Sequence, residues 1–554
     1  MSKQISFGDY QFTFKVLTTG NVYDVELIDR VQEQGRMVFR SKEMSYGDDS
    51  GRVPAFFEVT FTENPSGISW QAHAEHHEPI KGIKVMIESF APGDLITPPG
   101  IRTQIPDGPG LCFVYPDGMW PIRERGGETG TVDTLYLPGM SAQFVLIENP
   151  EQTVFIHARE YPLRFKRFWF YLVDNHIEVH LYSEANGFER SGEYTAPVWH
   201  IDHVASKEDA VESYATWMEK AFNLVPYEQR SDVPDWLRKT ALVTILHGIT
   251  SDGKICHNFA DMEARLHELA RLFPPEHTLV KLTGYEGRVD YHLPENLPGE
   301  EIGGHEGLAS FMETAHSLGF KVMFHLNAWG MGYDHPLYPE MRQHQILDIN
   351  GRPAEWGVDY DKDQVLELTF AYISPDSPEF REVLLSCVRH LVDLYSPDAL
   401  HMDQSAFLIN DLRHNHMRGI ITLFRELNET FPDVLFTGEG AAEWVAGIYS
   451  LSSGLGYVWG EPDLIDEIFR RTVTRYMRCY AHSVTMPPEP YRGVWTMPPL
   501  RSWWSKDRFQ KLQAFHERIG VIPTLVLTDK RIQLDGDLSQ VVFERARRWL
   551  AEKN

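Results

Sequence analysis

The 554-residue sequence contains few cysteines, and none of them are paired at metal-ligand spacing. The four cysteines lie far apart and form no CxxC motif, which argues against a zinc ribbon or a thiol redox centre. They are Cys112, Cys256, Cys387 and Cys479. We expect these thiols to be reduced.

Long apolar runs are also missing. No run approaches the roughly 18 apolar residues that suggest a membrane helix, and the amino terminus has no apolar segment of the signal-peptide kind. The sequence therefore predicts a soluble, cytoplasmic protein with no membrane partner. It leaves open whether the chain forms a homo-oligomer.

Positive charge is scarce. The 52 Lys and Arg residues face 79 Asp and Glu residues, which gives a formal charge of −27. A phosphate backbone would be repelled, and no local stripe of basic residues offsets this, so we expect no nucleic-acid partner. A carbohydrate substrate is compatible with such a surface, because most sugars are neutral.

The pattern of predicted secondary structure changes near residue 205. Before it, short stretches rich in β-branched and aromatic residues alternate with turn signals, which is typical of an all-β sandwich over residues 1–205. Residues 206–237 are predicted to link this domain to the next through a helix over 207–222.

After residue 237, short apolar strands alternate with amphipathic helices, as in repeated βα units. The predicted strands cover residues 241–247, 278–284, 321–327, 398–403, 434–440, 448–459, 480–486 and 521–528. The clearest predicted helices cover residues 305–318, 378–395, 416–430 and 537–551. Eight strands over this length predict an α/β fold, a TIM (β/α)8 barrel at 238–554. A doubly wound open sheet is the alternative, but no Gly-rich phosphate loop follows any strand.

Two carboxylates stand at predicted strand ends, where TIM barrels carry their active sites. Asp403 ends an apolar strand, and an ionised carboxylate is costly to bury there unless it has partners or a task. Glu439 lies between two glycines at the end of the next strand, and such neighbours leave room for a ligand. The alternatives are a helix-capping Asp403 and an exposed turn residue at Glu439.

This pair has the chemistry that glycosidic cleavage needs. One acid protonates the leaving oxygen while the other carboxylate attacks the sugar or activates water. Adjacent strands lie about 4.8 Å apart, so the two groups can reach the roughly 5–5.5 Å separation of a retaining mechanism. The reaction requires neither a cofactor nor a metal.

Other side chains near the strand ends are candidates for binding a sugar. Polar groups can hydrogen-bond hydroxyls and aromatic rings can stack on sugar faces, although ordinary packing is an equal interpretation for the tryptophans and for His325. The candidates are His325, Asn327, Trp329, His401, Gln404, Asp290, Tyr291, Trp444 and Trp459.

Metal and serine-nucleophile chemistry find less support. The first predicted strand ends with a single histidine, His247, whereas a metal-dependent amidohydrolase would show two, one residue apart. The segment 413–416 has ligand-like spacing but lies at a predicted helix start, which we interpret as a solvated face. No Gly-x-Ser-x-Gly elbow is present. A metal-dependent barrel hydrolase and an inactive carbohydrate-binding or scaffold protein stay open as alternatives.

Several motifs together resemble a known group of proteins. They are Gly-Arg-Val-Asp-Tyr-His-Leu-Pro at 287–294, Gly-Gly at 303–304, Gly-Phe-Lys-Val-Met-Phe-His-Leu-Asn at 319–327, His-Met-Asp-Gln at 401–404 and Thr-Gly-Glu-Gly at 437–440. The sequence resembles glycoside-hydrolase-like barrels with an N-terminal β-supersandwich, which include a large family known as a domain of unknown function. More distantly it is similar to endo-α-N-acetylgalactosaminidases and to the α-amylase and α-galactosidase superfamilies.

The resemblance implies a retaining glycosidase for α-linked sugars. It assigns Asp403 as the nucleophile and Glu439 as the acid/base. The α-amylase pattern has an arginine two residues before the nucleophile and an aspartate after strand 7. This chain has His401 at the first position and no aspartate at 482–488, so the resemblance does not extend to amylase specificity.

Overall fold

The computed structural model describes residues 3–553, apart from residues 28, 34, 48, 99, 117–133, 137–138, 251–252, 288–291, 359–366, 454–467, 482–505, 528–529 and 531. The chain forms two compact units. The first contains Met1–Leu224, Phe407–Arg413 and Asp463–Val473, and the second contains Val225–Ala406, His414–Pro462 and Thr474–Asn554. The predicted domain limits of 1–205, 206–237 and 238–554 stay predictions.

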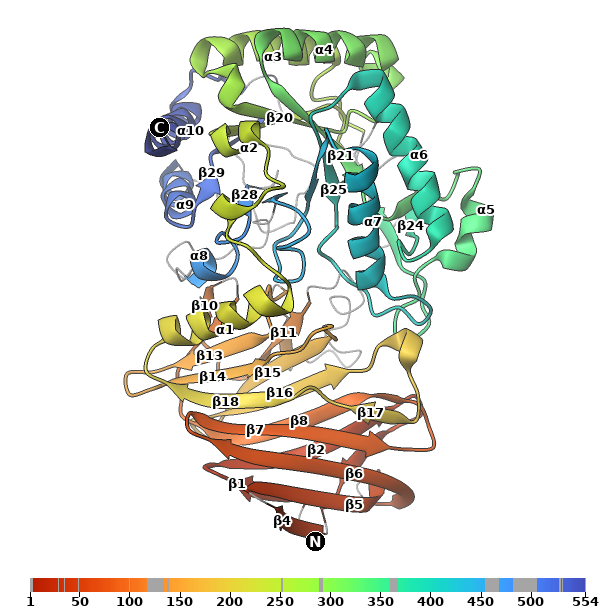
Figure 1. The fold of residues 1–554 in the computed structure, drawn as a ribbon, viewed down its shortest axis with the longest axis vertical. Helices are drawn as coiled ribbons and strands as arrows, with labels where there is room; N and C mark the ends of the chain where they lie inside the picture. Colours follow the sequence, from red (N-terminus) through yellow and green to blue (C-terminus); the bar gives the residue numbers. More distant parts are fainter. Residues whose placement is uncertain are drawn as a thin grey trace. The chain divides into compact units, whose positions relative to one another are not determined.

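The first unit is built from antiparallel strands (Figure 1). Its described strands are β1 Gln4–Phe7, β2 Tyr10–Thr18, β3 Val22–Val25, β4 Asp29–Glu33, β5 Arg36–Tyr46, β6 Gly51–Asn64, β7 Gly67–Glu75, β8 Ile80–Phe90, β9 Asp94–Thr97, β10 Ile101–Thr103, β11 Gly110–Tyr115, β12 Thr134–Tyr136, β13 Phe144–Glu148, β14 Thr153–Ala158, β15 Lys166–Val173, β16 His176–Glu184, β17 Glu193–Thr195 and β18 Trp199–Val204. The pairing of β11 with β12 is parallel, unlike the others. The predicted all-β region is confirmed.

Strand pairing divides this unit into two layers. One runs β2–β8–β16–β15–β11, and the other runs β6–β7–β18–β14–β13–β9. Alternate residues of β2 are buried, as expected for a strand with one face on a core. From β2, the Phe12 ring packs edge-on against Phe61 at 4.9 Å and against Trp70 at 5.3 Å between centroids. The core of the sandwich is therefore aromatic.

Helix α1 (Lys207–Ala221) follows the sandwich strands, where a helix was predicted over 207–222. The Ser206 hydroxyl caps it by accepting a hydrogen bond from Asp209 N at 3.1 Å. Its buried face includes Tyr214, whose ring lies 4.9 Å from that of Phe144 on β13. The helix thus belongs to the core of the first unit.

The second unit holds a sheet of parallel strands. Its described strands are β19 Leu242–His247, β20 Thr278–Thr283, β21 Lys321–Asn327, β25 Ala399–Asp403, β26 Leu435–Gly438, β27 Leu451–Ser452, β28 Arg478–Tyr480, β29 Val521–Ile522 and β30 Thr524–Leu527. β29 pairs with β28 and β30 pairs with β19, while Pro523 alone separates β29 from β30. The sheet therefore closes on itself, and with β29 and β30 counted as one strand, it is the predicted eight-stranded barrel.

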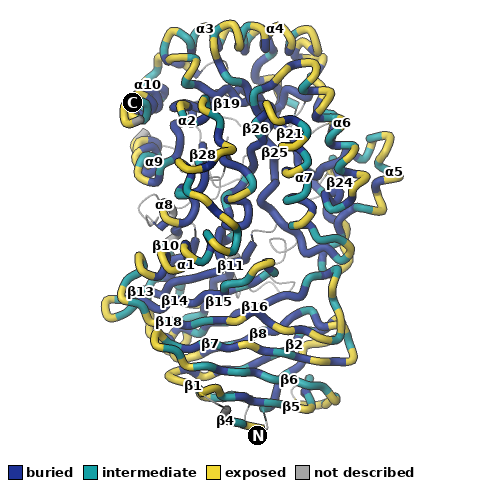
Figure 2. Tube along the Cα trace, in the orientation of Figure 1, coloured by how far each residue is buried: buried dark blue, intermediate teal, exposed yellow. Residues whose placement is uncertain are grey.

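Helices cover the outside of the barrel (Figure 1). In the described part of the second unit they are α2 Asp235–Lys239, α3 Phe259–Leu272, α4 Gly304–Leu318, α5 Tyr338–Met341, α6 Pro378–Tyr395, α7 His416–Thr430, α9 Lys506–Arg518 and α10 Asp537–Lys553. α4 ends at Gly319, whose φ of 96° is the left-handed conformation that favours glycine at a helix C-cap. Figure 2 shows buried strands inside and exposed residues on the helices.

Between β21 and β25 lies a small sheet that was not predicted. It consists of β22 (Gly330–Gly332), β24 (Glu367–Tyr372) and β23 (Glu355–Val358), all antiparallel. Its strands are short and pair over long stretches of sequence, so local periodicity carries little sign of them.

The barrel interior changes from apolar to polar along the strands. Alternate residues of a strand share one face, and the register pairs Met323 with Ala399, His325 with His401 and Asn327 with Asp403. The apolar pair belongs to the buried core of the unit. The polar pairs follow toward the carboxyl ends, where TIM barrels place their chemistry.

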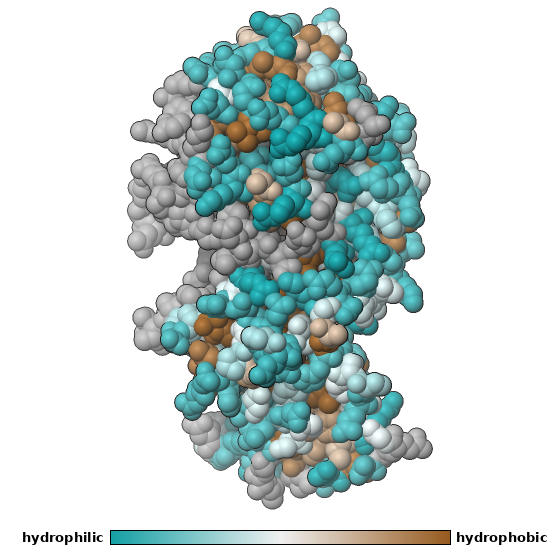
Figure 3. Space-filling view, turned by 90° about the vertical axis from the view of Figure 1, so that its left-hand side faces the viewer, coloured by the Kyte–Doolittle hydropathy of each residue, from teal (hydrophilic) through white to brown (hydrophobic). Residues whose placement is uncertain are grey.

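The face of the molecule drawn in Figure 3 is mostly polar where its residues are described. Figure 3 shows a largely hydrophilic face with apolar side chains in small separate groups. Among the described helices, none combines the length and apolar character needed to cross a membrane.

Candidate active site

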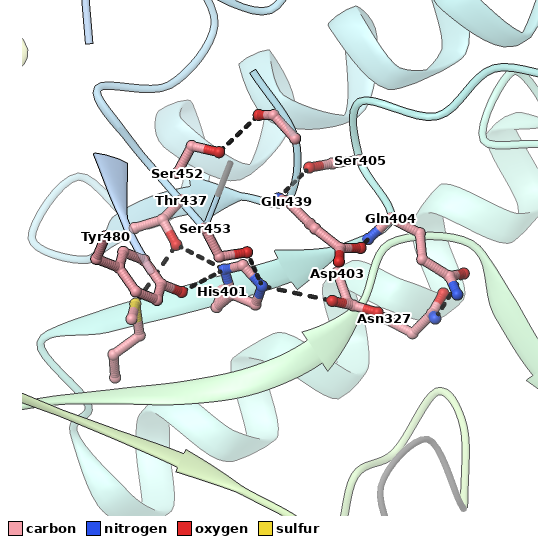
Figure 4. A network of polar contacts seen from close by, with 12 residues as sticks. Asn327, His401, Asp403, Gln404, Ser405, Thr437, Glu439, Ser452, Ser453 and Tyr480 are labelled. Atoms are coloured by element: carbon pink, nitrogen blue, oxygen red, sulfur yellow. Dashed lines mark hydrogen bonds and ion pairs between the residues drawn. The ribbon is translucent and has the colours of Figure 1, made fainter. Parts of the chain in front are cut away.

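Asp403 and Glu439 stand side by side at the carboxyl ends of adjacent strands. The register of β25 and β26 pairs Met402 with Gly438, which puts the next residue of each chain segment at one level. The Gln404 backbone N–H donates to Glu439 Oε2 at 2.9 Å, as Figure 4 shows. Because Gln404 N is bonded to the Asp403 carbonyl carbon, covalent geometry limits the two carboxyl carbons to within about 9 Å. Asp403 is 5% exposed.

Gln404 adopts an unusual backbone conformation between the two acids. Its φ is 61°, in the left-handed region that non-glycine residues seldom enter. The Asn327 amide donates to Gln404 Oε1 at 3.1 Å, and Asn327 Oδ1 accepts from Trp329 N at 3.0 Å and from Gly330 N at 2.8 Å. Strained residues held this firmly are common at functional sites. We interpret Asn327 and Gln404 as residues that position the acids.

His401 lies two residues before Asp403 on β25, in the barrel interior. Its Nε2 is 3.5 Å from Asp403 Oδ1, and its Nδ1 is 3.2 Å from both Thr437 Oγ1 and Tyr480 Oη (Figure 4). Ser453 Oγ lies 3.5 Å from His401 Nε2. With this many neighbours, and fully buried, the imidazole is placed to orient Asp403.

His325 completes a second arrangement around Asp403. Its ring lies 5.5 Å from that of His401, with 28° between the planes. One ligand atom each from His325, His401 and Asp403 lies within 4.8 Å of the others. Two imidazoles and a carboxylate are a ligand set that divalent transition metals accept. Residue spacing did not reveal this cluster, because its members come from two strands.

Tyr480 was not predicted as a site residue. Burial raises its pKa well above the ordinary value, and the negative charges of Asp403 and Glu439 raise it further. The Lys281 ammonium lies 5.5 Å from the Tyr480 ring centroid. Tyr480 is the last residue of β28, and it is the residue at which the predicted strand 480–486 began; residues 482–486 lie outside the described residues.

Glycine is needed at the two positions beside Glu439 for a different reason from the predicted one. A side chain at Gly438 would overlap the Tyr449 ring, and one at Gly440 would overlap Ala406. Gly440 also has a φ of 89°, which favours glycine. The interpretation that these glycines leave room for a ligand is therefore corrected, since the protein itself fills that space.

We expect Gly440→Ala to lower both stability and activity. The added methyl must displace Ala406, whose N–H is bonded to Glu439 O at 2.9 Å, so the acid moves. The expected cost is about 1–3 kcal/mol, with turnover down about tenfold or more. Denaturant unfolding and steady-state rates check this. Gly520→Ala is the control, because Gly520 shares a positive φ of 75° but has no atom within 4 Å of the new methyl. Equal behaviour of the two variants would contradict the explanation.

The predicted sugar-stacking tryptophans are buried. Trp329 is 0% exposed, with its ring 4.3 Å from both Tyr372 and His416. Trp444 is 3% exposed. In this conformation neither indole presents a face to a ligand. His416 is likewise buried rather than part of a solvated face, because it packs on Trp329.

Three predicted substrate-binding residues cannot be placed. Asp290, Tyr291 and Trp459 lie outside the described residues. The remaining candidates, His325, Asn327, His401 and Gln404, gather around Asp403 in the described part of the barrel.

Residues 202–445 match the family model of a domain of unknown function, DUF6259. This agrees with the resemblance drawn from the sequence motifs. No curated protein matches the chain.

Solved structures share the fold over nearly the whole chain. The α-N-acetylgalactosaminidase NagBb from Bifidobacterium bifidum is 12% identical, with a TM-score of 0.65 over 99% of this chain and 93% of its own. The α-galactosidase TtGalA from Thermus thermophilus is 11% identical, with a TM-score of 0.52 over 93% and 98%. The α-galactosidase AgaA from Geobacillus stearothermophilus is 10% identical, with a TM-score of 0.51 over 99% and 76%. At such identities the likeness shows a glycoside-hydrolase-like fold.

Proposed function

We propose that this protein hydrolyses α-glycosidic bonds with retention of configuration. The observation that carries the proposal is the hydrogen bond from Gln404 N to Glu439 Oε2, which ties the second acid to the residue that follows Asp403. Two carboxyl groups from neighbouring strands then lie together at the carboxyl end of a barrel, where TIM barrels place their chemistry. The limit of about 9 Å on the carboxyl separation admits both the roughly 5–5.5 Å of retaining glycosidases and the roughly 6.5–9.5 Å of inverting ones. Retention is proposed from the family resemblance.

The reaction proceeds in two displacements. Asp403 attacks the anomeric carbon while Glu439 gives its proton to the leaving oxygen, which departs as an alcohol. Glu439 then removes a proton from water, the water oxygen bonds to the anomeric carbon, and Asp403 leaves as a carboxylate. His401 orients Asp403, and the Gln404 N–H orients Glu439.

The named neighbours suggest the sugar. NagBb and TtGalA are, by name, an α-N-acetylgalactosaminidase and an α-galactosidase, so we propose galactose-type α-linked sugars as the substrate class. Aryl α-galactopyranoside and aryl 2-acetamido-2-deoxy-α-galactopyranoside test this against their β-anomers and against α-glucosides. We expect aryl alcohol release from an α-galactose-type substrate. Release from β-anomers alone, or from none of the glycosides, would overturn the proposal.

The second candidate is a metal-dependent hydrolase. It is favoured by the cluster of His325, His401 and Asp403, whose ligand atoms lie within 4.8 Å of one another. Dialysis against a chelator separates the two functions. A metal-dependent enzyme loses turnover and regains it with added Zn²⁺ or Mn²⁺, whereas the double-displacement enzyme keeps its rate after chelation.

A further inference from the structure

A second group of metal-ligand side chains lies in the sandwich, in the first unit. His157 on β14 stands directly opposite His200 on β18 in the antiparallel register. Asp202 lies two residues further along β18 and so shares the face of His200. One ligand atom from each of the three lies within 4.8 Å of the others. None of these residues takes part in the proposed reaction.

The contacts of these three side chains place their ligand atoms close together. His157 Nε2 is 2.9 Å from Asp202 Oδ2, and the two imidazole rings lie 4.6 Å apart with only 10° between their planes. Around a tetrahedral ion with bonds of about 2.1 Å, ligand atoms are separated by roughly 3.4 Å. The three ligand atoms lie within 4.8 Å of one another, which is close to that separation.

The surroundings also suit a metal ion. The Ser66 hydroxyl donates to Asp202 Oδ1 at 2.7 Å, which is how outer hydrogen bonds orient a metal-binding carboxylate. His157 is 2% exposed, whereas His200 and Asp202 are half-buried. The His157 ring lies 6.4 Å from that of Tyr214 on α1, so this ligand is held under the helix, while His200 and Asp202 are partly exposed.

The negative charge of Asp202 favours a bound cation, with one opposing group. The nearby Arg159 opposes a cation. Its guanidinium donates to Ser213 Oγ at 2.8 Å, and the Asp202 carboxylate supplies an opposite charge within the cluster.

We propose that His157, His200 and Asp202 bind a divalent transition-metal ion of the Zn²⁺ class. Two nitrogens and one carboxylate oxygen suit Zn²⁺, Co²⁺ and Ni²⁺ rather than Ca²⁺ or Mg²⁺, which prefer oxygen ligands. The ion would tie β14 to β18 and stabilise this part of the sandwich. The site is distinct from the barrel cluster of His325, His401 and Asp403.

Titration of the full chain with Co²⁺, followed by visible absorption and by competition with Zn²⁺, tests the site. We expect His200→Ala to weaken Co²⁺ binding at this site at least tenfold, so that one bound equivalent is lost. We expect Ser66→Ala to weaken Co²⁺ binding several-fold. His203→Ala is the matched control, because His203 lies on the same strand but faces the other side and is exposed. Its binding should equal that of the unmodified chain. Zn²⁺ should raise the melting temperature of the unmodified chain more than that of His200→Ala.

Any Co²⁺ bound by the barrel cluster of His325, His401 and Asp403 is identified with His325→Asn, which should lose that Co²⁺ alone. If His200→Ala does not fold, Asp202→Asn replaces it, since the amide keeps the shape of the carboxylate. Full Co²⁺ binding in a folded His200→Ala or Asp202→Asn protein would overturn the proposal. So would an unmodified chain whose bound metal is lost entirely in His325→Asn, or one that binds no Co²⁺ at concentrations up to about 100 μM.

Discussion

Asp403→Asn is expected to lower turnover by about a thousandfold or more. The amide has the shape of the carboxylate but is a far poorer nucleophile, so no covalent intermediate forms at a useful rate. Asp403 is buried beside His401, and the substitution removes a charge without leaving a cavity. The fold and ligand binding should therefore survive. Steady-state rates on the best aryl glycoside, with calorimetric binding of the released sugar, measure both effects.

Asp393→Asn is the matched control for this substitution. Asp393 is an exposed residue of α6, so its replacement should leave turnover unchanged. If the Asp403→Asn protein kept the original rate, Asp403 could not be the nucleophile. A chain that binds sugar but turns nothing over before any substitution would instead be the carbohydrate-binding or scaffold protein that the sequence left open.

Glu439→Gln is expected to have an effect that depends on the leaving group. Sugars and alkyl alcohols need a proton to depart, so their hydrolysis should slow by about 10²–10⁴-fold. A nitrophenolate leaves without help, so the first step with such a substrate should slow far less. Breakdown of the intermediate still needs the base, and added azide should restore turnover, because this anion attacks without proton removal.

Glu429→Gln, on the exposed side of α7, is the control for Glu439→Gln. A uniform loss of rate over all leaving groups, with no effect of azide, would contradict an acid/base role. In that case Glu439 would matter only for holding Gln404 N, to which it is bonded at 2.9 Å.

Local sequence patterns predicted the parts of the fold that depend on local chemistry. The strand ending at Asp403 and the helices α4, α6 and α7 were predicted within a few residues, because apolar runs and helical periodicity extend over whole elements. The strand predicted at 480–486 meets β28 (Arg478–Tyr480) only at Tyr480, and residues 482–486 lie outside the described residues. Three residues are too few for a periodic signal.

In the candidate active site, too, some residues could be predicted from local sequence and others could not. Asp403 and Glu439 could be proposed because a carboxylate at the end of an apolar strand is costly without a purpose. No local pattern indicated that Tyr480 meets His401, or that Trp329 is enclosed by Tyr372 and His416. Such contacts join residues more than 40 positions apart and depend on barrel closure. Tyr449 is close to Gly438 in sequence, but the position of its ring, which a side chain at Gly438 would overlap, depends on the irregular segment between β26 and β27.

Intact mass spectrometry of the Glu439→Gln protein, mixed with the activated aryl glycoside that the unmodified chain hydrolyses, tests the shared site most directly. If Asp403 and Glu439 act on one sugar, the first step proceeds, the second stalls, and the protein gains the mass of one glycosyl group, mapped to Asp403. A glycosyl group on another residue, or no added mass while aryl alcohol is still released, would contradict the two-carboxylate mechanism.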